Sequence, residues 1–401
     1  MSIHIKKRIA YISWVTPHAS SGGGPAAMYR HFVMRHDFDL LLLSSGILSP
    51  EIPLKYHIPK SHFVSRMSNT RLARVMRQYQ IVLAPYLWTK TVKPMIEAFN
   101  PDIVFTVADP ADSWGAYLLS QRMGIPFVVN FQDWWPESNY HYDFEKPVPF
   151  VRRIMARRFR IMHRDADLVF CTSQGMLDFL GPRQNAHVLL PTGPPRNQRY
   201  KPTFKKSTPA NCLRLGYAGQ LPINSYGKYV LDLAHEIEIL SGEFELFAFG
   251  SCAGAAKVTA EQLSRLGMYK GFLSPCELEK QLQECDVLLA VMGFSENSPV
   301  WLKTSFTTKI LDYARLGKPI LIWGPDDCSP VKLARKTGFA LTCTENSPRK
   351  VLQLLSTLKC PTTYAAAAQH AWEAGISYLD HDLIHKIFVN NITKVSRSDQ
   401  L

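Results

Sequence analysis

Short apolar runs alternate with longer amphipathic segments over most of the chain. The runs in the first half are RIAYISWV, FDLLLLSS, DIVFTVA, PFVVNF, DLVFCTS and HVLLP, and those in the second half are LRLGYAG, FELFAFG, DVLLAVM, KPILIWG and FALTC. Continuous runs rich in β-branched and aromatic residues, separated by helical segments, are typical of parallel strands buried on both faces. The pattern predicts an α/β protein with two doubly wound, Rossmann-like domains facing a cleft.

A stretch of linker composition separates the two sets of runs. Thr192 to Cys212 holds four prolines, many Lys and Arg and almost no apolar periodicity. After Pro361 the pattern predicts helices over TYAAAAQHAWEAG and LIHKIFVNNITKV. We therefore expect an N-terminal acceptor-side domain over 1–192, a linker over 193–212, a C-terminal donor domain over 213–378, and a terminal helix and tail over 379–401.

Composition narrows the class of protein. A length of 401 residues suits two domains of about 200 residues each. The eight cysteines stand singly, which favours neither a disulfide framework nor a structural zinc and indicates a reducing cytosol. No stretch approaches the roughly 20 apolar residues that span a bilayer. The run from Ile9 to Val15 lacks a cleavage site, so we interpret it as a first strand rather than a signal peptide.

The net charge of +13 lies mainly in the first half, where residues 1–200 hold 24 Lys/Arg and 14 Asp/Glu. The densest part is FVRRIMARRFRIMHR, residues 150–164, in which arginines flank an apolar helical stripe of Val151, Ile154, Met155 and Met162. This helix either lies on an anionic membrane surface or covers the sheet with its arginines in solvent. A second basic amphipathic stretch, 61–79, favours the membrane. No nucleic-acid motif accompanies the charge.

Ligands of open α/β sheets bind beyond the carboxyl ends of the strands. After the first run, three glycines from Gly22 to Gly24 precede a helix and would let a phosphate or a sugar approach; a flexible loop is the alternative. His18 lies in the same loop. After PFVVNF comes QDWWPE, in which Asp133 would orient a sugar hydroxyl while Trp134 and Trp135 cover its apolar face. The alternative is a helix N-cap by Asp133 with both tryptophans in the core. Glu137 lies in the same segment as Asp133, and Asp109 and Asp112 are weaker candidates of the same kind.

The second half holds the donor-site candidates. Gly219 and Lys228 follow LRLGYAG, and the lysine at a helix start would suit a diphosphate. Gly250 opens a small-residue turn that would admit a base or ribose. The most informative segment runs from Gly293 to Gly324, where Thr307, Thr308 and Lys309 lead into a helix that carries Asp312. We expect Lys309 and Asp312 to meet on one helix face, with the lysine on phosphate and the carboxylate on ribose.

These segments, in this order, resemble the retaining glycosyltransferase family 4 of GT-B fold over nearly the whole chain. The matching stretches are the glycine loop, PDIVFTVADPADSWGAYLLSQRMGIPFVVNFQDWWPE, DADLVFCTSQGM, LRLGYAGQ, YKGFLSPCELEKQLQECDVLLAV and TTKILDYARLGKPIL. DWWPE is similar to the Asp-x-Trp-Pro-Glu of a subgroup that builds bacterial surface polysaccharides on lipid carriers. The resemblance implies that Asp133 faces the reacting sugar, Lys228 and Lys309 hold the diphosphate, and Asp312 binds ribose. It also implies a base pocket at Gly271–Ser274, which contains Phe272 and Leu273.

The chain departs from the family pattern at two donor-site positions. The family has two glutamates eight residues apart, but here Thr304 stands eight residues before Asp312. Gln220 replaces an arginine that the family often has after the YAG motif. Lys303 or Lys309 would then compensate for the lost cation, and Glu296 for the lost carboxylate.

The combined interpretation is a glycosyltransferase that moves a sugar from a nucleoside diphosphate sugar to a hydroxyl acceptor with retention, and a lipid-linked glycan is one candidate acceptor. It requires neither a prosthetic group nor a metal, and it places the protein in the cytoplasm, either free or docked on the inner membrane face. Two alternatives stay open. One is a catalytically silent GT-B partner protein that binds a nucleotide or glycan, and the other is a GT-B sugar-nucleotide epimerase.

Overall fold

The structure is a computed structural model that describes residues 6–19, 23–59, 73–137, 148–195, 204, 212–222, 226–240, 242–294 and 299–396. The chain divides into two compact units. The first unit comprises Met1–Pro195, Pro299–Phe306 and Ile384–Leu401, and the second comprises Arg196–Ser298 and Thr307–Leu383. Two segments from late in the sequence therefore belong to the first unit. Most of the expected linker lies outside the described residues.

The first unit is built on a parallel seven-stranded sheet. Its strand order is β3 (Lys55–His57), β2 (Asp39–Ser44), β1 (Arg8–Ile12), β4 (Ile103–Val107), β5 (Phe127–Phe131), β6 (Leu168–Cys171) and β7 (Ala186–Val188). β1 lies between β2 and β4, with Tyr11 opposite both Leu42 and Phe105. The order reverses at β1, which makes the sheet doubly wound, as predicted.

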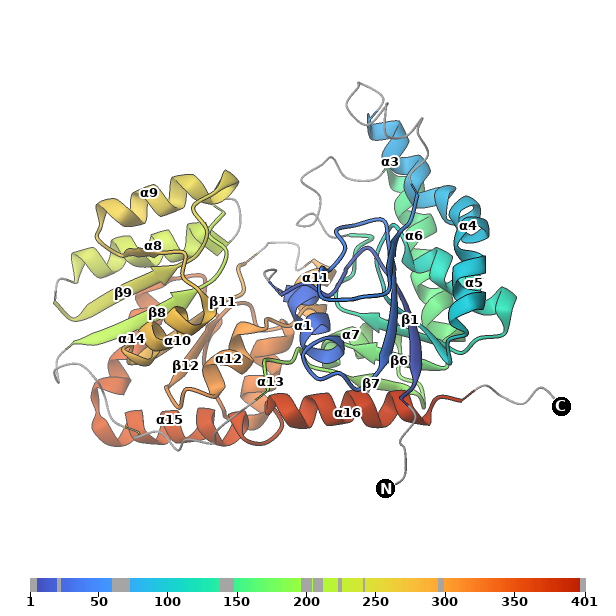
Figure 1. The fold of residues 1–401 in the computed structure, drawn as a ribbon. Coiled ribbons are helices and arrows are strands. Elements are labelled where there is room, and N and C mark those ends of the chain that lie inside the picture. Colours follow the sequence, from blue (N-terminus) through green and yellow to red (C-terminus); the bar gives the residue numbers. More distant parts are fainter. Residues whose placement is uncertain are drawn as a thin grey trace. The chain divides into compact units, whose positions relative to one another are not determined.

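Helices cover both faces of this sheet. They are α1 (Gly23–Phe32), α3 (Ala73–Val82), α4 (Ala84–Phe99), α5 (Ser113–Met123), α6 (Pro149–Asp165), α7 (Gln174–Leu180), α11 (Val300–Thr304) and α16 (His381–Lys394), the last from Ile384 onwards. Figure 1 shows α4, α5 and α6 together on one side of the sheet. On the opposite face, α16 places Phe388 among core aromatic rings. Its ring centroid lies 5.2 Å from Phe32, 6.0 Å from Phe105 and 5.4 Å from Phe170.

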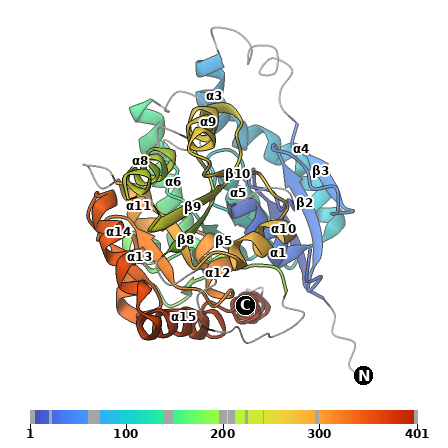
Figure 2. The same ribbon diagram turned by 90° about the vertical axis from the view of Figure 1, so that its left-hand side faces the viewer.

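The second unit has a parallel six-stranded sheet. Its order is β10 (Tyr269–Gly271), β9 (Phe244–Phe249), β8 (Leu213–Ala218), β11 (Val287–Val291), β12 (Ile320–Trp323) and β13 (Leu341–Cys343). The helices are α8 (Tyr226–Ile239), α9 (Lys257–Arg265), α10 (Pro275–Gln283), α12 (Lys309–Ala314), α13 (Ser329–Thr337), α14 (Pro348–Ser356) and α15 (Pro361–Gly375), with short 3-10 turns η1 (Gly254–Ala256) and η2 (Thr357–Lys359). Figure 2 shows α8 and α9 on one side of these strands and α12 and α15 on the other.

Each apolar run of the sequence overlaps a strand, so the predicted fold class is confirmed. The sequence pattern missed β3 and β10, which have three residues each and are partly exposed. Both are short outer strands of their sheets, where a continuous apolar run is not required. The two helices predicted after Pro361 correspond to α15 and α16.

Candidate functional site

Lys309 is the first residue of α12, and its ammonium group is buried in the second unit. Its Nζ lies 3.4 Å from the Tyr217 hydroxyl oxygen and 4.5 Å from the centre of the Tyr217 ring. The Tyr226 ring centre lies 5.8 Å away. Burial lowers the pKa of Lys309 to about 8, because a desolvated ammonium group is less stable than a solvated one.

Two of the predicted glycines make this burial possible. Gly219 follows β8 and Gly250 follows the neighbouring strand β9, and the Gly219 amide donates to the Phe249 carbonyl over 2.9 Å. A Cβ atom on Gly219 would overlap Lys309 Nζ, and one on Gly250 would overlap the Gly219 carbonyl oxygen. The loops after β8 and β9 can therefore approach each other and the ammonium group only because both residues are glycine. The structure thus brings Gly219, Gly250 and Lys309 together.

The expected Lys309–Asp312 pair does not form. Within the part of the chain that the structure describes, no carboxylate lies at ion-pair distance from Lys309 Nζ, and burial alone accounts for the shift in its pKa. Asp312 Oδ1 instead lies 4.0 Å from Nε2 of the buried His381. The prediction failed because it considered only the spacing of Lys309 and Asp312 along the helix. It could not show that the lysine side chain packs against Tyr217 and Gly219 of another segment. Thr307 and Thr308 are half-buried, and the Thr308 carbonyl accepts from the Leu311 and Asp312 amides.

The other predicted donor-site residues lie nearer the surface. Lys228 is exposed on α8, two residues after Tyr226. Phe272 is exposed and Leu273 half-buried, in the loop that enters α10. This loop begins at Gly271, whose φ of +96° favours glycine and whose carbonyl accepts from the Gly250 amide over 3.1 Å. The loop at Gly271 is therefore tied to the turn at Gly250, as a shared pocket would need. Glu296 lies outside the described residues.

Sequence reasoning missed two tyrosines at the end of β8, of which Tyr217 contacts Lys309. Tyr217 is buried, and its hydroxyl donates to the Gln220 carbonyl over 2.7 Å. The Tyr313 hydroxyl accepts from the Ala218 amide over 3.0 Å. Both tyrosines lie in segments that the sequence pattern selects. Tyr217 is the tyrosine of LRLGYAG, and Tyr313 directly follows Asp312. A polar tip on an apolar ring at the end of a buried strand indicates a specific hydrogen-bond partner.

In the first unit, Asp133 accepts a hydrogen bond of 2.8 Å from the Ser305 hydroxyl. Ser305 directly follows α11, which packs on α7. The Ser173 hydroxyl donates to the Thr304 carbonyl over 2.5 Å. Thr304 itself is buried, and its hydroxyl donates to Val300 of its own helix over 2.9 Å. The residue at the lost glutamate position is therefore part of the structure of the first unit.

The tryptophans beside Asp133 are not an open sugar-stacking surface. Trp134 packs edge-on against Phe159 and Phe179, with ring centroids 5.7 Å and 4.8 Å away, and both Trp134 and Trp135 are buried. The alternative that places both indoles in the core is correct. Asp133 is not a helix N-cap, because the residues that follow it directly, 134–137, do not form a helix.

Asp109 and Asp112 are also used internally. Both are buried. Asp109 accepts from the Ser13 hydroxyl over 2.7 Å and from the backbone amides of Trp14, Ala111 and Asp112 over 2.7 to 2.8 Å. Burial raises its pKa, while these hydrogen bonds oppose the rise. Asp112 accepts from the amide and the hydroxyl of Ser45. The two carboxylates therefore hold the loops after β1 and β2 rather than a ligand.

The glycine loop is described from Gly23 onwards, whereas Gly22 lies outside the described residues. Gly23 begins α1 with φ +61°, and a Cβ atom on Gly24 would overlap the Gln132 side chain. The His18 amide donates to the Pro25 carbonyl over 3.3 Å. Gly24 therefore packs closely against the segment that precedes Asp133. This packing favours a loop of defined conformation over a flexible loop.

The basic helix α6 turns its apolar stripe inward. Val151, Met155 and Met162 are buried, so the stripe covers the sheet and is not available to a membrane. Arg158 is buried as well and donates to the carbonyls of Ile81 and Val82 over 2.6 and 2.7 Å. The arginines that remain exposed are Arg153, Arg157, Arg160 and Arg164. The stretch 61–79 lies largely outside the described residues.

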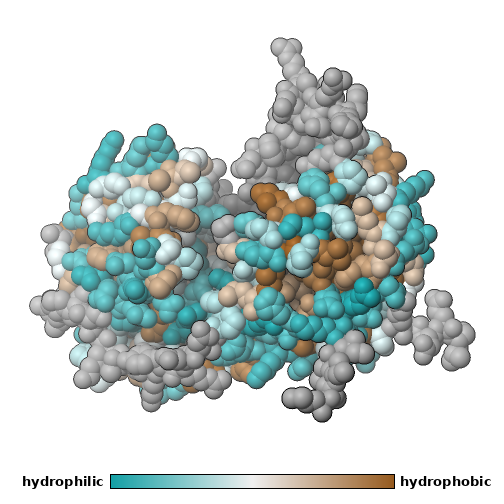
Figure 3. Space-filling view, in the orientation of Figure 1, coloured by the Kyte–Doolittle hydropathy of each residue, from teal (hydrophilic) through white to brown (hydrophobic). Residues whose placement is uncertain are grey.

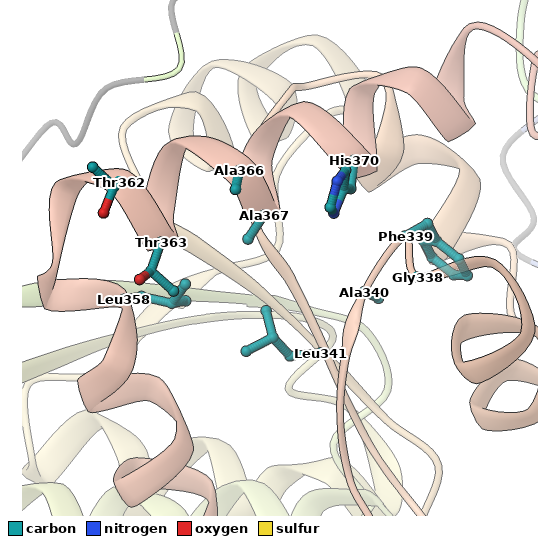
Figure 4. A pocket seen from close by; sticks show the side chains of 10 residues that line it. All are labelled: Gly338, Phe339, Ala340, Leu341, Leu358, Thr362, Thr363, Ala366, Ala367 and His370. Atoms are coloured by element: carbon teal, nitrogen blue, oxygen red, sulfur yellow. The ribbon is translucent and has the colours of Figure 1, made fainter.

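A cavity of about 510 Å³ lies elsewhere in the second unit, between α15 and the segment that enters β13 (Figure 4). Its lining is mostly apolar, with Thr362, Thr363 and His370 as the polar contributors. None of the residues predicted to bind a nucleotide sugar lines it. No helix within the described ranges is long and apolar enough to cross a membrane. Nor do three or more His, Cys, Asp or Glu side chains gather there in a way that could hold a metal ion.

Comparisons with known proteins agree with this architecture. Residues 58–193 match the family model described as a glycosyl transferase 4-like domain. Among curated protein sequences, none matches the chain significantly. HepE of Anabaena, solved in complex with UDP, is 14% identical with a TM-score of 0.66 and covers 97% of this chain and 100% of its own. Sucrose-phosphate synthase from Thermosynechococcus elongatus is 10% identical with a TM-score of 0.67, covering 97% of this chain and 99% of its own.

A Listeria monocytogenes protein described as a UDP-N-acetylglucosamine 2-epimerase is also similar. It is 14% identical with a TM-score of 0.55, and the match covers 99% of this chain and 100% of that protein. At such identities these likenesses establish the fold alone. The chain therefore has a glycosyltransferase-like GT-B fold with two parallel-sheet, Rossmann-like units.

Proposed function

We propose that the protein is a glycosyltransferase that moves a sugar from a nucleoside diphosphate sugar to a hydroxyl acceptor. The observation that carries the proposal is the buried ammonium group of Lys309, which lies against Gly219 and has no carboxylate at ion-pair distance among the described residues. A buried cation is costly unless an anion compensates it. The diphosphate of a sugar donor is such an anion, and the glycine loops beside Lys309 give it room to approach.

The catalytic role of Lys309 follows from this placement. As the bond between the anomeric carbon of the sugar and the diphosphate oxygen breaks, negative charge develops on the leaving diphosphate. A nearby ammonium group stabilises this charge. Because the cation is already desolvated, its interaction with the phosphate is stronger than it would be in water. We also assign Lys228 on α8 and the backbone amides near Thr308 to the diphosphate. Asp312 next to His381 is the proposed ribose ligand.

On the acceptor side, we assign Asp133 to the reacting sugar. The Ser305 hydroxyl fixes its carboxylate by donating to one oxygen, so the orientation of that group is set before substrates bind. Gly23 and Gly24 leave the α1 loop without side chains beside the same segment. The family resemblance completes the proposal. It implies retention at the anomeric carbon, and the likeness of DWWPE to a polysaccharide-building subgroup implies a lipid-linked acceptor.

A cytoplasmic protein that docks on the inner membrane face also belongs to the proposal. Arg153, Arg157, Arg160 and Arg164 are exposed on α6, as is Phe150 at its start. Such a basic face attracts anionic lipid headgroups through screened electrostatics. Docking would occur through these side chains rather than through the buried stripe of the helix.

Two other functions have specific support. The Listeria monocytogenes neighbour favours a sugar-nucleotide epimerase. The burial of Thr304 at the position of the lost glutamate favours a silent partner protein that binds a nucleotide without turnover. An epimerase would convert the donor with no acceptor present, which a transferase would not do.

Thermal unfolding with UDP, GDP, ADP and their sugar conjugates tests the proposal, because a specific ligand raises the apparent melting temperature by mass action. We expect one nucleotide family to stabilise the protein and Lys309→Ala to abolish most of that shift. The exposed Lys270 of the same unit provides the matched control, Lys270→Ala. No stabilisation by any nucleotide would contradict the proposal, and binding without transfer or hydrolysis would support the silent partner.

A further inference from the structure

Trp14 is an exposed indole at the carboxyl end of β1. Hydrophobic side chains gather on the face of the first unit that Figure 3 displays, and the exposed apolar residues of this unit include Trp14 and Ile47. The Trp14 side chain is 41% exposed, whereas Trp134 and Trp135 are 1% and 4% exposed. Leaving part of an indole in water forgoes stabilisation of roughly 25 cal/mol for each Å² of apolar surface. Trp14 therefore leaves part of an apolar ring open to a ligand.

The backbone and ring of Trp14 are held in place. Its amide donates to Oδ2 of the buried Asp109 over 2.8 Å. The ring meets the buried Trp135 edge-on, with centroids 5.7 Å apart and planes at 76°. Gly46 from the loop after β2 lies directly against it, because a Cβ atom there would be 2.7 Å from the Trp14 carbonyl oxygen. The indole is therefore presented in one orientation, as a flat and rigid surface.

Its surroundings combine apolar and polar groups. Ile47 is exposed beside Gly46, and its carbonyl accepts from the Thr16 hydroxyl over 2.5 Å. Asp112 fixes the same loop through the amide of Ser45. Trp135, which contacts Trp14, stands two residues after Asp133, the carboxylate assigned to the reacting sugar. A flat apolar plane thus lies at the same edge of the sheet as the proposed acceptor-side carboxylate.

We propose that Trp14 stacks on the apolar face of a sugar ring, so that the acceptor is itself a carbohydrate. The inference rests on the proposed function and assigns the acceptor class that the fold leaves open. A pyranose ring presents C–H groups on one face and hydroxyl groups around its rim, which suits an indole plane with a carboxylate nearby. Because the indole is already fixed, binding loses little side-chain entropy.

An array of defined oligosaccharides, probed with the full chain in the presence of saturating UDP, tests this inference. We expect the wild-type protein to bind at least one glycan and Trp14→Ala to weaken that binding by about tenfold or more, as loss of an aromatic stacking partner does. Trp14→Phe keeps a smaller ring and should retain part of the affinity. The control is Tyr378→Ala, which removes an aromatic residue of the second unit that is 40% exposed. This variant should bind the glycan as tightly as wild type.

The results separate the inference from the proposed function. UDP affinity is measured on the same samples, and it should be equal in wild type and Trp14→Ala. If the wild-type protein binds UDP but no glycan, or binds glycans equally well without Trp14, the stacking proposal is wrong while the donor site stands. If Trp14→Ala loses UDP affinity, the ring stacks on the base and the proposal is also wrong. A wild-type protein that binds no nucleotide removes the proposed function itself.

Discussion

The two units use their charged residues at the carboxyl ends of the strands in opposite ways. In the first unit, Asp109 and Asp112 each accept several hydrogen bonds from the protein itself. In the second unit, Lys309 is desolvated and faces tyrosine rings and glycine backbone, with no carboxylate partner within the described part of that unit. Asp109 and Asp112 hold loops of the first unit, whereas Lys309 of the second unit is the residue that we propose to bind an anion. Position at a strand end therefore identifies a site only when internal partners do not already satisfy the group.

Removal of Asp109 should be the most damaging of the changes considered. Asp109→Ala removes the acceptor of several backbone amides that are buried or partly buried, and each such group costs about 1–3 kcal/mol. We expect the free energy of unfolding of the first unit to fall by about 3 kcal/mol or more, measured by urea denaturation. The exposed Asp178 gives the control Asp178→Ala, which should change stability by less than about 0.5 kcal/mol. Equal stability of both variants would contradict the loop-holding role of Asp109.

Lys309→Ala should act on binding instead of folding. Charge-assisted hydrogen bonds contribute about 1.5–3 kcal/mol, so we expect the affinity for UDP to fall about 10- to 100-fold in isothermal titration calorimetry. The free energy of unfolding should not fall, because a desolvated cation without a carboxylate partner among the described residues destabilises the folded state and the substitution removes it. Unchanged affinity would move the donor site away from Lys309, and Asp312→Ala would then test the ribose position separately.

A pair of glycine substitutions sharpens the comparison. Gly219→Ala and Gly24→Ala each place a methyl group against the tip of a flexible side chain, Lys309 in the second unit and Gln132 in the first. We expect Gly219→Ala to weaken UDP binding about tenfold, because the ammonium group must move, and Gly24→Ala to leave it within about twofold. Similar losses in both variants would show that the two units do not divide the donor and acceptor roles as proposed.

The pH dependence of binding follows from the lowered pKa of Lys309. The free protein loses this proton as the pH rises through about 8, and a bound diphosphate favours the protonated form. UDP affinity attributable to Lys309 should therefore be full below pH 8 and decrease by up to about tenfold per pH unit above it. The stability of the folded protein depends on pH in the opposite direction, because Lys309 of the unfolded chain keeps its proton up to about pH 10.5. The contribution of Lys309 to stability should rise with pH between these values, and Lys309→Met should remove both effects.

The smallest effect concerns the exposed arginines of α6. Each basic residue near an anionic bilayer contributes about 1 kcal/mol, so Arg157→Gln should weaken co-sedimentation with phosphatidylcholine–phosphatidylglycerol vesicles about fivefold. Arg158 is unsuitable for this test, because its buried guanidinium group holds the carbonyls of Ile81 and Val82. Binding of Arg157→Gln that equals wild type, at low salt, would argue against docking through this face.

Sequence reasoning succeeded where a local pattern determines the structure. Apolar runs located the strands, and Gly219 and Gly250 stand directly after two of them, so their proximity follows from adjacent parallel strands. It failed where the outcome depends on which neighbour a side chain meets. Nothing local indicates that Trp135 is covered while Trp14 is exposed, that Arg158 turns inward, or that Lys309 contacts Tyr217 rather than Asp312. The bond from Ser305 to Asp133 joins residues 172 positions apart, and no spacing rule could have found it.

The position of Phe388 has a consequence for biogenesis. Its ring lies among Phe32, Phe105 and Phe170, yet it is translated long after all three. While the ribosome is making the second unit, the first has no occupant for this space and no Ser305 to hold Asp133. The aromatic core of the first unit can therefore be completed only after the last helix has been translated. A stop codon before residue 384 would damage the half of the protein that was made first.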